Sequence, residues 1–288
     1  MKLSVDCCII SEKFEDKEAV KMIKEAGFDC FDYSFCCRGD DLPIFGENHR
    51  EYARDLRKYI DEIGISCNQA HAPFPLGYGI EFCESNPKYL RLIRSMESAS
   101  ILGAKNIVVH AQHVPEETGE DTFEYNVRYY KSLIPYCEKF GISVAVENLA
   151  RIDPRRKCYI ESFAGTPEAQ NKFLDEVNSP WIVACLDTGH ASLVSVDPEK
   201  FILKSNKNRL KALHVHDTDF IEDRHTVPFI CDLNWEAIMK NLKKIGYEGD
   251  LTFEIPEYFA RIPNPLIPDA LIFAQKVGRH LIGIFENN

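Results

Sequence analysis

A repeated pattern of helix, glycine and short apolar strand runs through the chain and limits the folds that it can adopt. In five segments a glycine follows a helical stretch, a short β-branched or apolar run comes next, and a polar residue ends it. The segments are 26–34 (AGFDCFDYS), 63–71 (IGISCNQAH), 102–110 (LGAKNIVVH), 140–148 (FGISVAVEN) and 245–255 (IGYEGDLTFEI). Glycine commonly closes the C-terminus of a helix. Each segment therefore predicts a helix end followed by a buried strand.

Helix candidates occupy the intervals between these strands. They are residues 17–26, 48–63, 87–102, 122–140, 167–177, 198–204, 234–245 and 268–285. Three of them begin at a capping residue followed by proline, as in Asn86-Pro87, and proline suits the first turn of a helix. Three further strand-like runs, 2–8, 181–187 and 210–216, complete eight strands that alternate with eight helices.

Eight such units in 288 residues, with no linker between them, predict an α/β fold. We expect one domain, residues 1–288, folded as a single (β/α)8 barrel whose active site lies at the C-terminal ends of the strands. The main alternative is an open, doubly wound sheet. No Gly-x-Gly-x-x-Gly follows the first strand, which argues against the dinucleotide-binding form of that sheet.

Composition narrows the classes of function. The formal net charge of −11 disfavours binding to nucleic-acid phosphates. The 11 cysteines are scattered and include no Cys-x-x-Cys pair, so neither a disulfide framework nor a zinc finger is indicated. No apolar run approaches the roughly 18 residues of a membrane span, and the N-terminus has no signal-peptide core. We expect a soluble, cytoplasmic protein with no nucleic-acid or membrane partner.

Side chains that can bind a metal end six of the eight predicted strands. They are His71, His110, Glu147, Asp187 with His190 just beyond it, His214 with His216, and Glu254. One such residue alone is more often a hydrogen-bonded loop residue than a ligand. Their convergence on one rim is what indicates a site. A carboxylate at the end of a buried strand needs a partner, because a buried unpaired charge is costly, and a divalent cation could satisfy several at once.

The densest cluster is LHVHDTDFIEDRHTVPF, residues 213–229, which holds three of the nine histidines. Together with VAVEN (144–148), CLDTGH (185–190) and FEIP (253–256), this segment resembles the sugar isomerase/epimerase superfamily. These are xylose-isomerase-like barrels that include D-tagatose 3-epimerase-type enzymes and predicted sugar phosphate isomerases. The resemblance extends over essentially the whole chain.

The resemblance implies one divalent metal (Mn, Mg, Co or Zn) at the barrel mouth, held by Glu147, Asp187, His214 and Glu254. Glu147 and Glu254 would be the catalytic base and acid, moving a proton through a metal-bound enediolate of a sugar or sugar phosphate. His190 would hydrogen-bond a substrate oxygen. Relatives are often dimers or tetramers, so a homodimer or a homotetramer is possible, but the sequence leaves the oligomeric state open.

Other residues near the predicted mouth are candidates for contacts with the substrate. His71 and His110 could contact it or support the ligands. His216 shares a strand face with His214, since side chains repeat every two residues, and we expect His216 and Asp217 to point into the mouth. The basic run Arg151, Arg155, Arg156 and Lys157 is either a solvated loop or a clamp for a substrate phosphate.

A second resemblance is to the zinc AP endonucleases, which share this barrel and bind three metals. Nine positions have the residue types of that family: His71, His110, Glu147, Asp187, His190, His214, Asp223, His225 and Glu254. Asp223 and His225 would hold a metal of their own in a nuclease, and would shape the loop over the substrate in an isomerase. The charge of −11 and the TVPF that follows His225 favour the isomerase. A dehydratase or lyase and a non-catalytic sugar-binding barrel are further alternatives.

Overall fold

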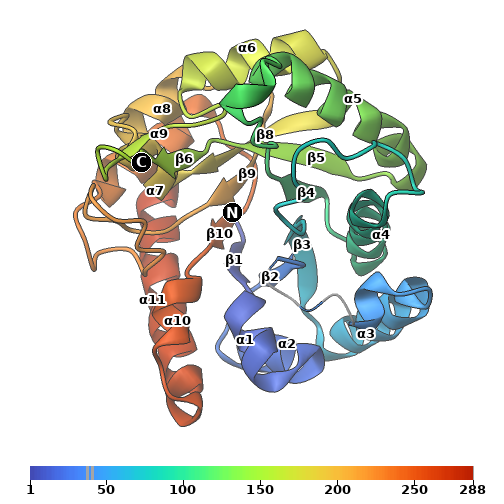
Figure 1. The fold of residues 1–288 in the computed structure, drawn as a ribbon. Helices are drawn as coiled ribbons and strands as arrows, with labels where there is room; N and C mark the ends of the chain where they lie inside the picture. The colour runs from blue at the N-terminus through green and yellow to red at the C-terminus, as the bar shows by residue number, and fades with distance from the viewer. Residues whose placement is uncertain (37–38, 40–41, 288) are drawn as a thin grey trace.

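The computed structural model describes residues 1–36, 39 and 42–287, and its main sheet is a ring of eight parallel strands. The strands are β1 (Leu3–Asp6), β2 (Cys30–Ser34), β3 (Ser66–His71), β4 (Asn106–Val109), β5 (Ser143–Glu147), β8 (Ile182–Asp187), β9 (Leu210–His214) and β10 (Leu251–Phe253). Their hydrogen-bonded order is β10-β1-β2-β3-β4-β5-β8-β9. A parallel bridge between Val215 and Phe253 joins the two ends of this order. The predicted (β/α)8 barrel is confirmed (Figure 1).

Helices surround this ring. The eight that were predicted are α2 (Asp16–Glu25), α3 (His49–Ile63), α4 (Pro87–Leu102), α5 (Thr122–Phe140), α6 (Pro167–Val177), α8 (Pro198–Lys204), α9 (Trp235–Ile245) and α11 (Ile267–Glu286). They agree with the eight predicted helices to within one residue at each end. The predicted strands were longer than the observed ones. Five of the predicted ranges included the glycine and the turn that precede the strand, and the ranges 2–8 and 210–216 ran two residues past the observed strand ends.

Helix α4 shows how the sequence determines such bounds. Asn86 Oδ1 accepts hydrogen bonds from the backbone N–H groups of Lys88 and Tyr89 at 3.1 and 3.3 Å, which satisfies two donors of the first turn. Gly103 ends the helix with a φ of +99°, a conformation that other residues rarely adopt. The same glycine closure precedes β3 and β5.

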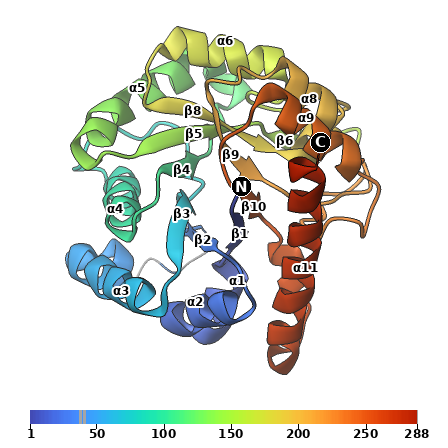
Figure 2. The same cartoon turned by 180° about the vertical axis from the view of Figure 1, so that it is seen from behind.

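Helix α11 packs closely against the barrel. It contacts α9, α2 and β1, and it runs along one side of the molecule when viewed from behind (Figure 2). A Cβ at Gly278 would lie 2.4 Å from Leu3 Cδ1, so this glycine lets the helix approach β1. Within the described residues no helix has both the length and the apolar character needed to cross a bilayer.

One side of the barrel interior is apolar below its mouth. A separate cluster of buried side chains, on β4, β5, β8 and β9, consists of Val108, Ala145, Val183, Cys185 and Ala212. Ala145, Cys185 and Ala212 each precede a polar strand-end residue by two positions, so each shares a strand face with one. An apolar floor therefore lies beneath the polar residues at the mouth.

Several short elements lie in the connections between strands and helices. They are helices α1 (Cys8–Phe14), α7 (Thr188–Leu193) and α10 (Pro256–Ala260), the 3-10 turns η1 (Pro43–Phe45), η2 (Glu116–Thr118) and η3 (Asn264–Leu266), and an antiparallel hairpin of β6 (Ala150–Ile152) and β7 (Tyr159–Glu161). The sequence did not predict them. Helix α7 and the hairpin lie in the connections that follow β8 and β5.

Candidate metal centre

Four side chains from different strands converge at the mouth of the barrel. Glu147 ends β5, Asp187 ends β8, His214 ends β9 and Glu254 directly follows β10. One ligand atom from each lies within 4.8 Å of all the others. His214 Nδ1 lies 3.2 Å from Glu147 Oε1 and 3.4 Å from Glu254 Oε2. We call these four residues the primary group. They are the four that the sequence assigned to one metal.

Polar atoms of the primary group are buried without a hydrogen bond. Among the described residues, Glu147 Oε1, Glu254 Oε2 and both ring nitrogens of His214 have no hydrogen-bond partner. Leaving such groups unsatisfied in the interior is costly. A divalent cation would be a shared partner for one atom of each side chain. Three carboxylates and one imidazole fit Mn²⁺, Mg²⁺, Co²⁺ or Zn²⁺.

The ionisable groups here depend on one another. Burial raises the pKa of Glu147, but the neighbouring His214 and His110 outweigh it and hold that pKa well below its ordinary value. Burial lowers the pKa of His214, while Cys185, Glu254 and Glu147 raise it, and the net shift is upward. Without a metal, a proton on His214 thus balances the neighbouring carboxylates. A metal ion that binds here would displace that proton, because a histidine ligand must be neutral.

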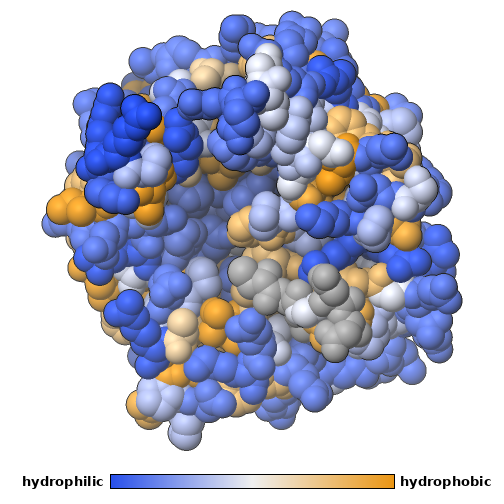
Figure 3. Space-filling model, viewed as in Figure 1, coloured by the Kyte–Doolittle hydropathy of each residue, from blue (hydrophilic) through white to orange (hydrophobic). Residues whose placement is uncertain are grey.

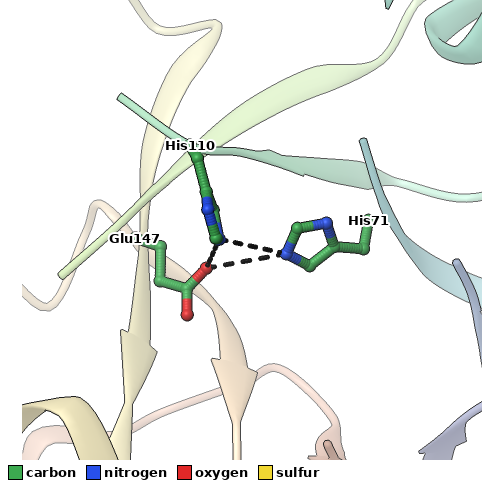
Figure 4. Close-up of side chains that lie close together, drawn as sticks. All are labelled: His71, His110 and Glu147. Carbon is green, nitrogen blue, oxygen red and sulfur yellow. Dashed lines mark hydrogen bonds and ion pairs between the residues drawn. The ribbon is translucent and has the colours of Figure 1, made fainter. Parts of the chain in front are cut away.

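A second donor group adjoins the first through Glu147 (Figure 4). His71 Nε2 and His110 Nε2 lie 3.2 Å apart, and His110 Nε2 lies 2.9 Å from Glu147 Oε2. His71 Nδ1 lies 2.9 Å from the carbonyl oxygen of Ala72, to which it can only donate. In the neutral ring this leaves Nε2 of His71 unprotonated and directed at His110 and Glu147. The pair is therefore placed to bind a cation or a substrate hydroxyl.

A third donor group consists of His190, Asp223 and His225. Asp223 Oδ2 lies 3.3 Å from His190 Nε2 and 3.3 Å from His225 Nε2. Burial lowers the pKa of His225, but Asp223 and Glu254 raise it to about 10. Asp223 Oδ1 is buried with no hydrogen-bond partner in the described chain. The loop after β9 thus brings two more potential ligands to the edge of the primary group.

Asp187 is held in place from two sides. Its backbone N–H donates to Asn148 Oδ1 at 2.7 Å, and its carbonyl accepts from Asn148 Nδ2 at 3.0 Å. His216 Nε2 lies 3.0 and 3.1 Å from its two carboxylate oxygens. The His216 side chain is fully buried, and its ring stacks on His225 at 3.9 Å. His216, which we expected to bind the substrate, thus contacts Asp187 of the primary group instead of open space.

Asp217 has a different environment from the one predicted. Its carboxylate is fully buried and accepts hydrogen bonds from four donors in the chain that follows it. The donors are the backbone N–H groups of Thr218, Cys231 and Leu233 and the indole N–H of Trp235, at 2.9 to 3.2 Å. The prediction that Asp217 points into the mouth was wrong. It ties the loop that carries Asp223 and His225 to the end of β9.

Two carboxylates of the barrel interior were missed by the sequence reasoning. Asp6 ends β1, and burial together with Asp32 and Glu254 raises its pKa to about 8. Asp32 lies within β2, where Gln69 Nε2 donates to its Oδ2 at 2.7 Å, and His214 Nε2 lies 3.7 Å from that oxygen. The first strand was predicted to run to residue 8, which hid Asp6. Correct strand bounds would have revealed it.

In the space-filling view of Figure 3, the centre of the molecular face is hollow and lined with hydrophilic residues. Phe74 covers part of the second group, with its ring centroid 4.1 Å from that of His110.

The basic run predicted after β5 lies on the β6–β7 hairpin. Arg151 lies on β6, while Arg155, Arg156 and Lys157 are exposed in the turn of the hairpin, where Arg156 Nε lies 3.5 Å from Asp153 Oδ2. Of this basic run, only Arg151 is among the residues lining a cavity that also contacts His110 and His190.

Comparison with known proteins places this architecture among relatives. An uncharacterized protein of Sinorhizobium fredii, y4fM, is 23% identical over 295 residues, which cover 89% of each chain. A D-tagatose 3-epimerase-like protein superposes with a TM-score of 0.75 at 20% identity, covering 100% of this chain and 99% of the other. The IolI protein, solved with a bound zinc atom, has a TM-score of 0.75 at 19% identity, covering 99% of both chains. At such identities the structures establish the fold.

The family model described as "Xylose isomerase-like TIM barrel" matches residues 20–276, nearly the whole described structure. This match spans all four residues of the primary group and the elements that carry them. The chain therefore belongs to the xylose isomerase-like TIM barrel family.

Proposed function

We propose that the protein is a metal-dependent isomerase or epimerase of a sugar or sugar derivative. The observation that carries this proposal is the convergence of Glu147, Asp187, His214 and Glu254, whose ligand atoms lie within 4.8 Å of one another and include buried atoms that lack hydrogen-bond partners. The likeness to a D-tagatose 3-epimerase-like protein and to a zinc-containing IolI protein supports the reaction class and the need for a metal.

The roles of the chain's own residues follow from their positions. A bound divalent cation would supply Lewis-acid polarisation of the substrate carbonyl, which acidifies the neighbouring C–H bond. Glu147 is fully buried and its pKa is held low, so it is ionised and able to accept that proton. The side chain of Glu254 is 13% exposed, so it reaches the open mouth and can return a proton to the carbon. His71 and His110 lie where they can bind a substrate hydroxyl.

The proposal is tested by replacing Glu254 and following solvent deuterium into the substrate. Glu254→Gln should keep its fold and lower the exchange rate at the carbon next to the carbonyl by about 10²-fold or more, the usual size of a general acid–base contribution. Glu257→Gln is the matched control, because Glu257 is exposed three residues further along. Undiminished exchange in a metal-loaded Glu254→Gln variant, measured by NMR, would contradict the two-glutamate mechanism.

A second candidate is a three-metal phosphodiesterase of the AP endonuclease type. It is favoured by one observation: three of the five donor sets in the described chain, namely the primary group, the His71–His110–Glu147 group and the His190–Asp223–His225 group, lie side by side and share only Glu147. The net charge of −11 weighs against a DNA substrate. Elemental analysis separates the candidates, since the isomerase should bind about one ion per chain tightly and the nuclease about three. Cleavage of an abasic-site duplex would establish the second.

A further inference from the structure

A cavity of about 610 Å³ leads away from the metal centre between α5 and α6; we call it the side cavity. Its inner end is formed by His110 and His190, which belong to the second and third donor groups. Its other walls come from the loop after β4, the first residues of α5, one side of α6 and the β6–β7 hairpin. A substrate held at the primary group would therefore face this space past two histidines.

The volume of the side cavity is more than a single bound sugar would use. Cavities of about 300–1,000 Å³ hold ligands of drug size, and a single sugar ring is smaller than these. None of Glu147, Asp187, His214 and Glu254 is among the lining residues. A ketose whose oxygens lie at the primary group thus leaves the side cavity to another part of the substrate.

The inner wall of the side cavity is aromatic. Phe163 and Phe173 have ring centroids 4.8 Å apart, and Phe123 and Phe173 have centroids 5.8 Å apart, both with edge-to-face geometry. Phe173 is buried, whereas Phe123 and Phe163 keep part of their surface exposed. Partly exposed aromatic surface in a cavity is suited to the apolar C–H face of a ring.

The polar residues of the side cavity carry both signs of charge. Arg151 and Lys172 contribute positive charge and Glu116 and Glu161 contribute negative charge, beside three histidines, His110, His113 and His190. Lys172 Nζ lies 4.9 Å from the Phe123 ring centroid, so this cation is close to the aromatic wall. A phosphate group favours a site with an excess of positive charge. A neutral ring with hydroxyl groups can use donors and acceptors of both kinds.

We propose that the substrate is a glycosylated ketose, with its ketose unit at the primary group and its second sugar ring in the side cavity. This inference rests on the proposed function and specifies its substrate class. The β6–β7 hairpin supplies Arg151 and Glu161, and the segment 162–164 that follows it supplies Phe163. These residues determine which second ring is accepted.

Three probes that share one ketose head test the inference: D-fructose, fructose 6-phosphate, and 6-O-glucosyl-fructose. Deuterium uptake from solvent next to the carbonyl is measured by NMR with the metal-loaded protein. We expect kcat/KM for the disaccharide to exceed both other values at least tenfold. In chelator-treated protein, saturation-transfer NMR should show contacts to the glucosyl protons of the disaccharide, which does not depend on turnover.

A substitution that fills the side cavity separates binding of the second ring from chemistry. Ala169 lines the cavity from the first turn of α6, so Ala169→Phe should lower kcat/KM for the disaccharide at least tenfold and leave that for fructose within twofold. Ala169→Ser, which keeps the space open, is the matched control. Lys172→Ala, at an exposed position, should show the same selectivity if Ala169→Phe unfolds the protein.

The outcomes distinguish this inference from the proposed function. Exchange on fructose or fructose 6-phosphate that equals or exceeds exchange on the disaccharide overturns the side-cavity assignment and leaves the isomerase intact. Equal losses on fructose and on the disaccharide in both cavity variants also overturn it. No exchange on any probe by metal-loaded protein contradicts the proposed function and this inference with it.

Discussion

The ring of His216 occupies the space that a side chain at Gly189 would need. A Cβ built on Gly189 would lie 2.0 Å from His216 Cε1 and 2.6 Å from Nε2. The absence of that atom lets His216 Nε2 reach both carboxylate oxygens of Asp187. The glycine of the CLDTGH segment is therefore explained by the contact between His216 and Asp187, a residue of the primary group.

Gly189→Ala should weaken metal binding. The new methyl group must displace the buried His216 ring and with it the carboxylate of Asp187, and loss of a group that orients a metal ligand typically costs about 10–100-fold in affinity. Isothermal titration calorimetry with Mn²⁺ and Zn²⁺ measures the change. Gly283→Ala in α11 is the control, since a Cβ there meets nothing within 4 Å. Equal affinities for all three proteins would show that His216 does not position Asp187.

Asp217→Asn should destabilise the fold. The amide nitrogen would face two backbone or indole N–H groups that now donate to a carboxylate oxygen, so at least two hydrogen bonds are lost. Hydrogen bonds to a charged acceptor contribute about 1.5–3 kcal/mol each, and we expect the free energy of unfolding to fall by at least about 2 kcal/mol. Urea denaturation gives this value. Asp232→Asn, at an exposed position of the same loop, should change it by less than about 0.5 kcal/mol.

The buried carboxyl of Asp6 should make the metal-free protein less stable as pH rises. Its pKa is raised from 3.8 to about 8, so between these values the folded state keeps a proton that the unfolded state has lost. The free energy of unfolding therefore decreases with increasing pH across this window. Asp6→Asn should flatten the dependence and stabilise the protein at pH 8 by at least about 1.4 kcal/mol, the energy of one pKa unit. Thermal melts in chelator from pH 5 to about pH 8 check this. The same decrease of stability with pH in the variant and in the unmodified protein would contradict it.

Metal addition should stabilise the protein. A ligand that binds only the folded state at a free concentration of about 100 times its Kd raises the free energy of unfolding by about 2.7 kcal/mol. We expect this gain for Mn²⁺ or Zn²⁺ in urea titrations. His214→Gln should remove most of the gain, because it deletes the imidazole of the primary group. His280→Gln, on the outer helix α11, should retain it. A gain that survives in His214→Gln would mean that the metal binds elsewhere.

Patterns that repeat along the chain were sufficient to predict the barrel, its long helices and the convergence of Glu147, Asp187, His214 and Glu254. These predictions succeeded because each strand end can be recognised from the few residues around it, and the barrel brings all strand ends to one rim. The surroundings of each side chain were harder to predict from the sequence. His214 and His216 share a face in an extended strand, but β9 ends at His214, and His216 is enclosed by Gly189 and His225.

Contacts between distant segments explain the other differences. The role of Asp217 depends on Cys231, Leu233 and Trp235, which reach it only when the loop folds back. The β6–β7 hairpin was interpreted as a basic loop, because each of its strands has only three residues and no clear alternation. The charge of this segment alone did not indicate that the hairpin forms a wall of the side cavity.

The paired hydrogen bonds between Asn148 and Asp187 have a consequence for how such a barrel can diversify. They link β5 to β8 directly after Glu147, so the backbone at these two ligands is fixed before the chain enters the hairpin. We therefore expect that changes in residues 149–163 leave the backbone at Glu147 and Asp187 in place. If the proposed function holds, exchange of this segment is the change that a designer would try first to alter specificity, because it forms part of the side-cavity wall without contributing to the primary group.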